Sequence, residues 1–172
     1  MSLIDKISDD TPTLEEEAPF ETSTDANNAD SPKKSLSEPI FQQMPRTCQI
    51  FRQSKVNTNL IADLPKRIEE CFTQIGLKVS DEIKVLVPPI SAWDKSRGQY
   101  IADKIVENAC KQASDKICLH LLEDDAYDGI WNFVFGVAHR SQGCMVTLYR
   151  LNNDPDLIYK ICISLLGHVF GL

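Results

Sequence analysis

Only one of the three histidines, His168, stands in a pattern that is typical of chemistry. His168 and Gly171 match the second histidine and the glycine of H-E-x-x-H-x-x-G-x-x-H, in which imidazoles one helical turn apart hold zinc and the glutamate acts as general base. Ser164 occupies the first-ligand position, Leu165 occupies the general-base position, and a third ligand would stand at position 174, beyond Leu172. A hydroxyl is a poor zinc ligand, and leucine accepts no proton. We therefore expect His168 to hold no metal and interpret it as a helix-end imidazole favoured by the helix dipole.

The remaining histidines and one acidic run indicate no second site. His120 lies within an apolar run, which predicts a hydrogen-bonded core histidine, and His139 follows another, which predicts a solvated one. A site that combines these two with Cys162 and His168 matches no spacing of metal ligands. Residues 123–125 (Glu-Asp-Asp) could bind a divalent cation, but we interpret them as a solvated loop after a strand.

The cysteines indicate a reducing compartment. None belongs to a C-x-x-C pair and each falls inside an apolar run, so we expect reduced, buried thiols in a cytoplasmic or nuclear protein. The six are Cys48, Cys71, Cys110, Cys118, Cys144 and Cys162. The N-terminus has neither a basic region nor a long apolar run, and no window is apolar enough to span a bilayer, so we expect no membrane partner.

The charge of the chain is concentrated at its N-terminus. Residues 1–45 hold ten acidic and three basic residues, which accounts for the whole net charge of −7. This segment lacks apolar periodicity, and we predict that it is a disordered acidic tail. Residues 46–172 are neutral, with 15 acidic and 15 basic residues, and we expect them to form one α/β domain. A neutral domain provides no field to attract nucleic acid, so we expect a peptide or protein partner.

Apolar periodicity predicts an α/β fold with a mixed sheet. Trp131, Phe133 and Phe135 alternate at period two and are predicted to form one packed face of a strand. The last helix is apolar on nearly all sides and is predicted to be buried. The first three strands are expected to be mostly parallel, and the last two to form a hairpin. The predicted strands are residues 47–53, 83–87, 117–122, 129–138 and 144–151. The predicted helices are residues 58–76, 99–113 and 155–170, and Pro65 should make the first of them start late or kink.

Three stretches in residues 46–172 resemble the archaemetzincins, a metzincin-like family of zinc metallopeptidases. Residues 97–103 resemble the family's R-x-G-Q-Y-x-A-D, residues 131–138 its N-F-V-F-G-x-A, and residues 167–172 its G-H-x-F-G-L. The resemblance implies a twisted mixed sheet with two backing helices and a buried terminal helix that carries the first zinc ligands. It also implies a C-terminal subdomain and further cysteine motifs, which these 172 residues lack, so we expect a truncated metzincin-like domain.

The resemblance and the altered motif lead to three hypotheses about function. In the first, the chain is a family member that has lost catalysis and binds no zinc. In the second, it is a non-catalytic peptide- or protein-binding module that uses an exposed sheet edge, with Cys144, Val146 and Leu148 as the expected edge residues, and its acidic tail. In the third, it is an unrelated α/β interaction domain in which the acidic tail is the functional part.

The missing subdomain also predicts self-association. Without it, the end of the terminal helix should leave Val169, Phe170 and Leu172 partly uncovered. An exposed apolar patch of this kind marks a partner site or an aggregation liability.

Overall fold

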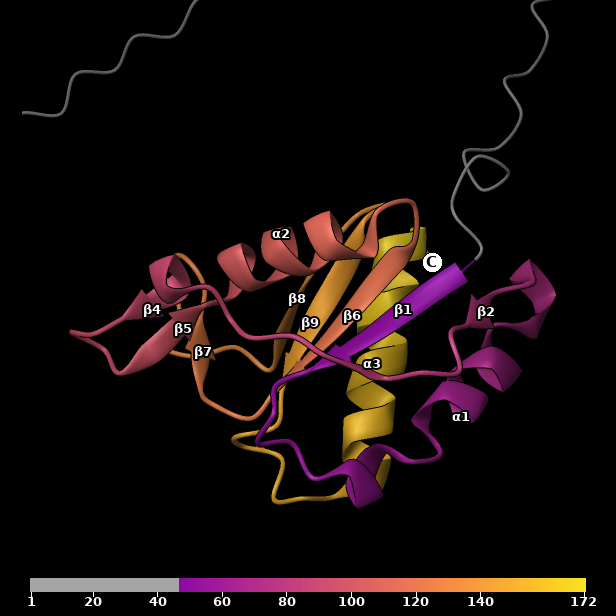
Figure 1. Ribbon diagram of the computed structural model, residues 1–172, viewed down its shortest axis with the longest axis horizontal. Helices are drawn as coiled ribbons and strands as arrows, with labels where there is room; N and C mark the ends of the chain where they lie inside the picture. The colour runs from indigo at the N-terminus through magenta and orange to yellow at the C-terminus, as the bar shows by residue number, and fades with distance from the viewer. Residues whose placement is uncertain (1–46) are drawn as a thin grey trace, which may run out of the picture. The chain divides into compact units, whose positions relative to one another are not determined.

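A mixed β-sheet forms the centre of the computed structural model, which describes residues 47–172 (Figure 1). The strand order is β2-β1-β6-β9-β8, with β3 also paired to β1, and every pair is parallel except β8 with β9. The strands are β1 (Thr47–Arg52), β2 (Lys78–Val79), β3 (Lys84–Val85), β6 (Ile117–Leu122), β8 (Gly136–His139) and β9 (Gly143–Thr147). The predicted acidic tail, residues 1–45, lies outside the described residues.

Helices cover both faces of this sheet (Figure 1). Helices α1 (Leu64–Cys71) and α3 (Pro155–Phe170) share one face, and α2 (Ala102–Ala113) packs on the other. Strand β6 is buried along its whole length, and its successive side chains pack alternately on the two faces of the sheet. The predicted α/β class is therefore confirmed, although the two earlier helices do not back the same face.

The remaining local elements follow turn and capping chemistry. Asn57 accepts a hydrogen bond from the Asn59 N–H and begins a 3₁₀ helix, η2 (Thr58–Ile61). Pro65 lies in the first turn of α1, so the predicted long helix divides there. A second 3₁₀ helix, η3 (Thr73–Ile75), ends at Gly76, whose φ of 69° is left-handed.

A small second sheet lies where no strand is predicted, and it includes residues 99–101, the start of the predicted helix 99–113. After η4 (Ile90–Ala92), strands β4 (Trp93–Asp94) and β5 (Gln99–Ile101) form a hairpin, and β5 pairs with β7 (Ala126–Tyr127). Asp94 holds the turn, because its carboxylate accepts hydrogen bonds from Ser96 and from the Tyr127 hydroxyl. These contacts, that of Ser96 first, lower the pKa of Asp94 to about 2.

The prediction of a strand across residues 129–138 is wrong for most of its length. Only β8 is extended and paired, and the Trp131 N–H closes a turn onto the Asp128 carbonyl. Trp131, Phe133 and Phe135 are 65%, 41% and 45% exposed, so they are not a packed face of a strand. Gly129, with φ of 51°, allows the chain to turn here.

Helix α3 has well-defined ends. The Asp154 carboxylate accepts hydrogen bonds from two N–H groups of the first turn, and Gly171 ends the helix with φ of 76°. The expected exposure of Val169 and Phe170 is wrong, since they are 0% and 5% exposed. Phe170 packs on Phe72 after α1, with ring centroids 5.5 Å apart, and only Leu172 of that group is exposed.

His120 lies in the core, as predicted, but without a hydrogen bond. Both of its ring nitrogens are buried and form no hydrogen bond, although the Leu86 backbone lies near enough to raise the pKa of the ring. Burial lowers the pKa of His120 to about 4, because a charged imidazole would lose its solvation, and the Leu86 backbone opposes this only in part. In residues 47–172, no helix is both long and apolar enough to cross a membrane.

We predict that His120 makes the fold sensitive to acid. The His120 imidazole binds a proton near pH 6.5 in the unfolded chain and near pH 4 in the folded chain. Its contribution to the free energy of unfolding is therefore constant above pH 6.5 and is lost as the pH falls from 6.5 toward 4. The free energy of unfolding should decrease by about 3 kcal/mol between pH 7 and pH 4 from this group alone. Urea titrations of the parent and of His120→Leu across this range measure the difference. Parallel pH profiles of the two proteins would contradict the prediction.

Candidate functional site

Ser164 and Leu165, the two altered motif positions, line an apolar cavity of about 320 Å³. Helix α3 contributes Ile161 in addition to these two residues, and β8 contributes Gly136. The opposite wall is the segment before β8, with Trp131, Val134 and the two phenylalanines Phe133 and Phe135. The cavity therefore lies between the motif helix and the edge of the sheet.

The aromatic wall is held by polar residues of the small sheet and of the turn after β9. Arg150 lies 4.2 Å above the Phe133 ring, and its Nη2 is 2.7 Å from an Asp125 carboxylate oxygen. Gln99 donates to the Asn132 carbonyl at 2.8 Å and to Asp125 at 2.9 Å. Burial opposes the charge on Asp125, but the hydrogen bonds from Arg150 and Gln99 outweigh it and lower the pKa of that carboxyl. These contacts fix the wall although its rings are exposed.

The acidic run 123–125 is thus not a simple solvated loop. Asp125 pairs with Arg150, and Asp124 lies 3.0 Å from Lys55 Nζ and accepts a hydrogen bond from Gln53. Both carboxylates are already neutralised by cations of the protein.

Leu165 lies directly against the backbone of β8. A Cβ placed on Gly136 would overlap both Leu165 Cδ1 and the Met145 carbonyl oxygen. The side chain at the general-base position is therefore a packing group that requires glycine opposite it.

The open edge beside the cavity is β8, not β9. The expectation that Cys144, Val146 and Leu148 form this edge is wrong. Strand β9 is paired on both sides, to β6 and to β8, and all three side chains are buried in the core. The chain order of the hairpin does not reveal which of its strands inserts into the sheet.

The hydrogen-bond register indicates which groups of β8 face outward. The Phe135 carbonyl accepts from the Thr147 N–H, and Gly136 lies opposite Val146 in the next, non-bonded position. Because bonded and non-bonded pairs alternate in antiparallel strands, the backbone groups of Gly136 and Ala138 point away from β9. These are the groups that an added strand could pair with.

His168 is exposed on the last turn of α3, one helical turn after Ser164. Its backbone carbonyl accepts from the Gly171 N–H, and the neighbouring Val169 carbonyl accepts from the Ser141 N–H at 2.9 Å. The helix end is thus closed by backbone groups, and the His168 ring remains free for solvent.

The three histidines of residues 47–172 stand on three different elements, β6, β8 and α3. Among these described residues, no group of three His, Cys, Asp or Glu side chains could hold a metal ion. His120 is buried in β6, and His139 pairs with Asp103 at 2.9 Å from its position on β8. His139 is therefore only partly solvated: its side chain is 26% exposed, and α2 supplies a carboxylate partner that the sequence did not indicate.

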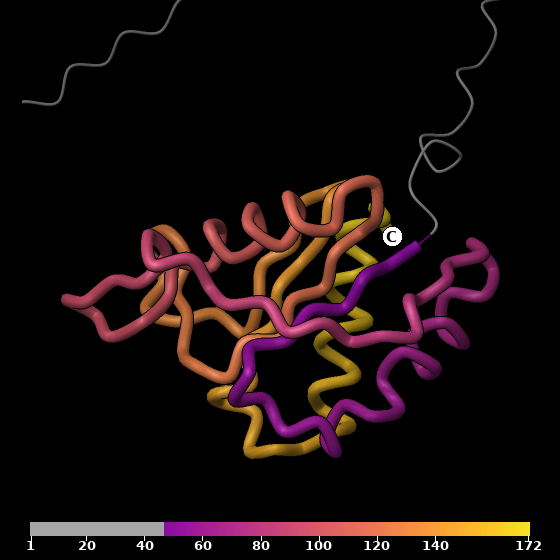
Figure 2. Tube along the Cα trace, viewed as in Figure 1, coloured from indigo at the N-terminus to yellow at the C-terminus, as the bar shows by residue number. Residues whose placement is uncertain are grey.

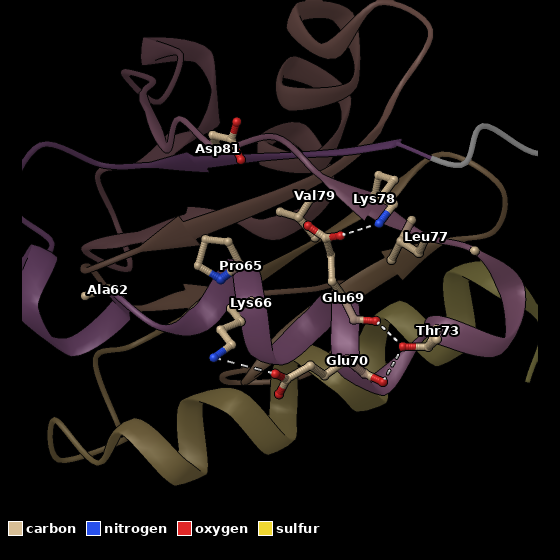
Figure 3. Close-up of a pocket in the computed structure, with 11 residues that line it drawn as sticks. Ala62, Pro65, Lys66, Glu69, Glu70, Thr73, Leu77, Lys78, Val79 and Asp81 are labelled. Atoms are coloured by element: carbon tan, nitrogen blue, oxygen red, sulfur yellow. Dashed lines mark hydrogen bonds and ion pairs between the residues drawn. The ribbon is translucent and has the colours of Figure 1, made fainter.

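A larger cavity, of about 520 Å³, lies between α1 and β2 (Figure 3). Four of its charged residues pair with one another: Glu69 lies 3.1 Å from Lys78, and Glu70 lies 3.8 Å from Lys66. The hydrogen bond from Lys78 lowers the pKa of Glu69, as expected for a carboxylate that is already paired. This cavity is therefore a weaker candidate than the one beside β8.

The fold, and the position of the cavity between α3 and β8, define a metzincin-like α/β domain. Comparison with known proteins identifies its family. No family model matches the chain. The chain is 30% identical over 132 residues to the archaemetzincin of Haloquadratum walsbyi, and the matched region covers 65% of this chain and 76% of that protein. It is 35% identical over 89 residues to the archaemetzincin of Nanoarchaeum equitans, which covers 52% of each.

Solved structures agree. The crystal structure of archaemetzincin from Methanopyrus kandleri superimposes with a TM-score of 0.62 at 27% identity, over 75% of this chain and 74% of that one. A zinc-dependent peptidase from Methanocorpusculum labreanum shares the fold, with a TM-score of 0.60 at 20% identity over 73% of this chain and 81% of that one. The chain belongs to the archaemetzincin family, as its sequence motifs predict. It spans about half the length of the Nanoarchaeum relative.

Two glycines, one on β8 and one on α3, test how closely these elements pack. We predict that Gly136→Ala destabilises the fold by about 1–3 kcal/mol, because the new methyl group overlaps the Met145 carbonyl and Leu165. Gly167→Ala on α3 is the matched control: nothing lies within 4 Å of its added Cβ, so the substitution should be neutral or stabilise by up to about 1 kcal/mol. Chemical denaturation of both variants measures the difference. Equal effects would show that β8 and α3 are not in close contact.

Proposed function

We propose that this chain is a non-hydrolytic archaemetzincin that binds an extended peptide segment along β8, with an apolar side chain of the peptide in the cavity beside α3. The observation that carries the proposal is that Ser164 and Leu165, at the first-ligand and general-base positions of the motif, line an apolar cavity instead of a metal site.

Loss of hydrolysis follows from side-chain chemistry. Zinc held by histidines in this helical frame needs an imidazole at the position of Ser164, and activation of water needs a carboxylate at the position of Leu165. Neither group is present at these positions, and among residues 47–172 no group of three His, Cys, Asp or Glu side chains could hold a metal ion elsewhere.

Peptide binding is supported by the groups that remain. The backbones of Gly136 and Ala138 present unpaired donors and acceptors at the open edge, and the adjacent cavity is walled by aromatic and aliphatic side chains. Its volume lies at the lower end of the range of ligand sites, which suits one bulky apolar side chain. The balanced charge of residues 46–172 also favours a peptide or protein over nucleic acid.

We predict that the purified full chain carries far less than one equivalent of zinc and cleaves no peptide. Elemental analysis and a fluorogenic peptidase assay measure these properties. Ser164→His restores an i, i+4 pair of imidazoles and should increase zinc affinity by about tenfold or more. This variant is the positive control, because it tests whether the assay detects zinc bound at this position. Stoichiometric, chelator-sensitive zinc in the parent would overturn the proposal.

For binding, we predict that fluorescein-labelled hexapeptides with a central leucine or phenylalanine bind in preference to those with a central aspartate. Ser164→Phe should fill the cavity and weaken binding of the leucine peptide by about tenfold or more, since one buried apolar side chain contributes about 1.5–3 kcal/mol. Ser164→Ala leaves the cavity open and is the matched control, with affinity near that of the parent. Fluorescence anisotropy measures each affinity. Equal binding by both variants, or no preference for an apolar centre, would contradict the proposed site.

A further inference from the structure

Two thiols lie within contact distance outside the cleft. Cys110 Sγ, on the last turn of α2, is 3.1 Å from Cys118 Sγ on β6. The two residues join the helical layer to the middle of the sheet, and the described cysteines are all free. At this separation the two sulfurs are already in van der Waals contact.

The two thiols differ in access to solvent. Cys118 is fully buried, and its sulfur occupies space that a side chain at Gly143 would fill. Cys110 is half-buried and lines a cavity of about 360 Å³ together with Lys111, Lys116 and Gln142. A small reagent can therefore reach Cys110 but not Cys118.

The pKa values of the two thiols also differ, and the more accessible thiol has the lower one. The hydrogen bond from the Cys118 thiol lowers the pKa of Cys110, burial opposes this, and His139 assists it. The same hydrogen bond, followed by burial, raises the pKa of Cys118. Since the thiolate is the nucleophile, Cys110 is the thiol that reacts first.

We propose that Cys110 and Cys118 form an oxidisable dithiol, a modification site at which Cys110 reacts with low-molecular-weight disulfides such as oxidised glutathione and Cys118 then completes an intramolecular disulfide.

The reaction balances in two exchanges. The Cys110 thiolate attacks one sulfur of the small disulfide, the S–S bond of the reagent breaks, and one small thiolate leaves and takes up a proton. The Cys118 thiol then loses its proton and attacks the Cys110 sulfur of the mixed disulfide, which releases the second small thiol. The protein dithiol is oxidised by two electrons, and the reagent is reduced to two thiols.

The experiment uses the full chain with Cys71→Ser as the parent, because Cys71 is exposed on α1 and would form unrelated adducts. Folded protein is treated with oxidised glutathione, quenched with acid, alkylated and examined by intact-mass measurement and peptide mapping. Circular dichroism before treatment confirms that each variant is folded.

Three results are expected. The parent loses two hydrogen atoms, retains no glutathione and yields a linked peptide that contains Cys110 and Cys118. Addition of Cys118→Ser leaves one glutathione on Cys110, because no second thiol releases it. Addition of Cys110→Ser decreases the rate of modification at Cys118 by about tenfold or more, because that thiol is buried.

The proposal is overturned if the parent keeps glutathione on Cys110 without a linked peptide, or if Cys110 does not react while the protein is folded. The mapping of the parent answers both points even if a serine variant fails to fold. The result does not depend on peptide binding at β8, so the two proposals stand or fall separately.

Discussion

Apolar packing of one side of α3 is the constraint on which the candidate site depends. Ile158, Cys162, Leu166 and the residues near the helix end are buried against the sheet and α1, and this packing fixes the rotation of the helix. Ser164 and His168 are consequently held on the outward side, and Leu165 is held at the border with β8. Figure 2 follows this last segment along the sheet that it covers.

The same constraint explains how the motif could change without loss of the fold. Ser164, at the first-ligand position, is exposed and contributes little to the core, so a ligand there can be replaced while the buried positions keep their apolar character. The aromatic wall of the cavity does not depend on α3, because Arg150 and Gln99, which lie outside this helix, hold it in place. The altered motif positions thus line an apolar cavity beside the open edge of β8.

The sequence predicts the regular elements well where the signal is local. The apolar run of β6, the caps of α3 and the left-handed Gly76 and Gly171 all lie where the residues indicate, because capping and periodicity are properties of neighbouring residues. Membership of the family, and the substitution of Ser164 and Leu165 in its motif, are also readable from the chain alone.

Tertiary structure decided the features that depend on distant residues. The alternating aromatics before β8 resemble a strand, but the turn at Asp128 and Gly129 and the contacts of Arg150 make them a cavity wall. Asp128 and Gly129 just before the aromatic residues, and Asn132 among them, were the available signal. Phe72, far from α3 in the sequence, determines that Phe170 is covered. The sequence by itself determined most of the regular elements and the residue types at the two altered motif positions, Ser164 and Leu165. The sheet edge, the cavity and the Cys110–Cys118 contact arise only from packing between elements, which no local pattern records.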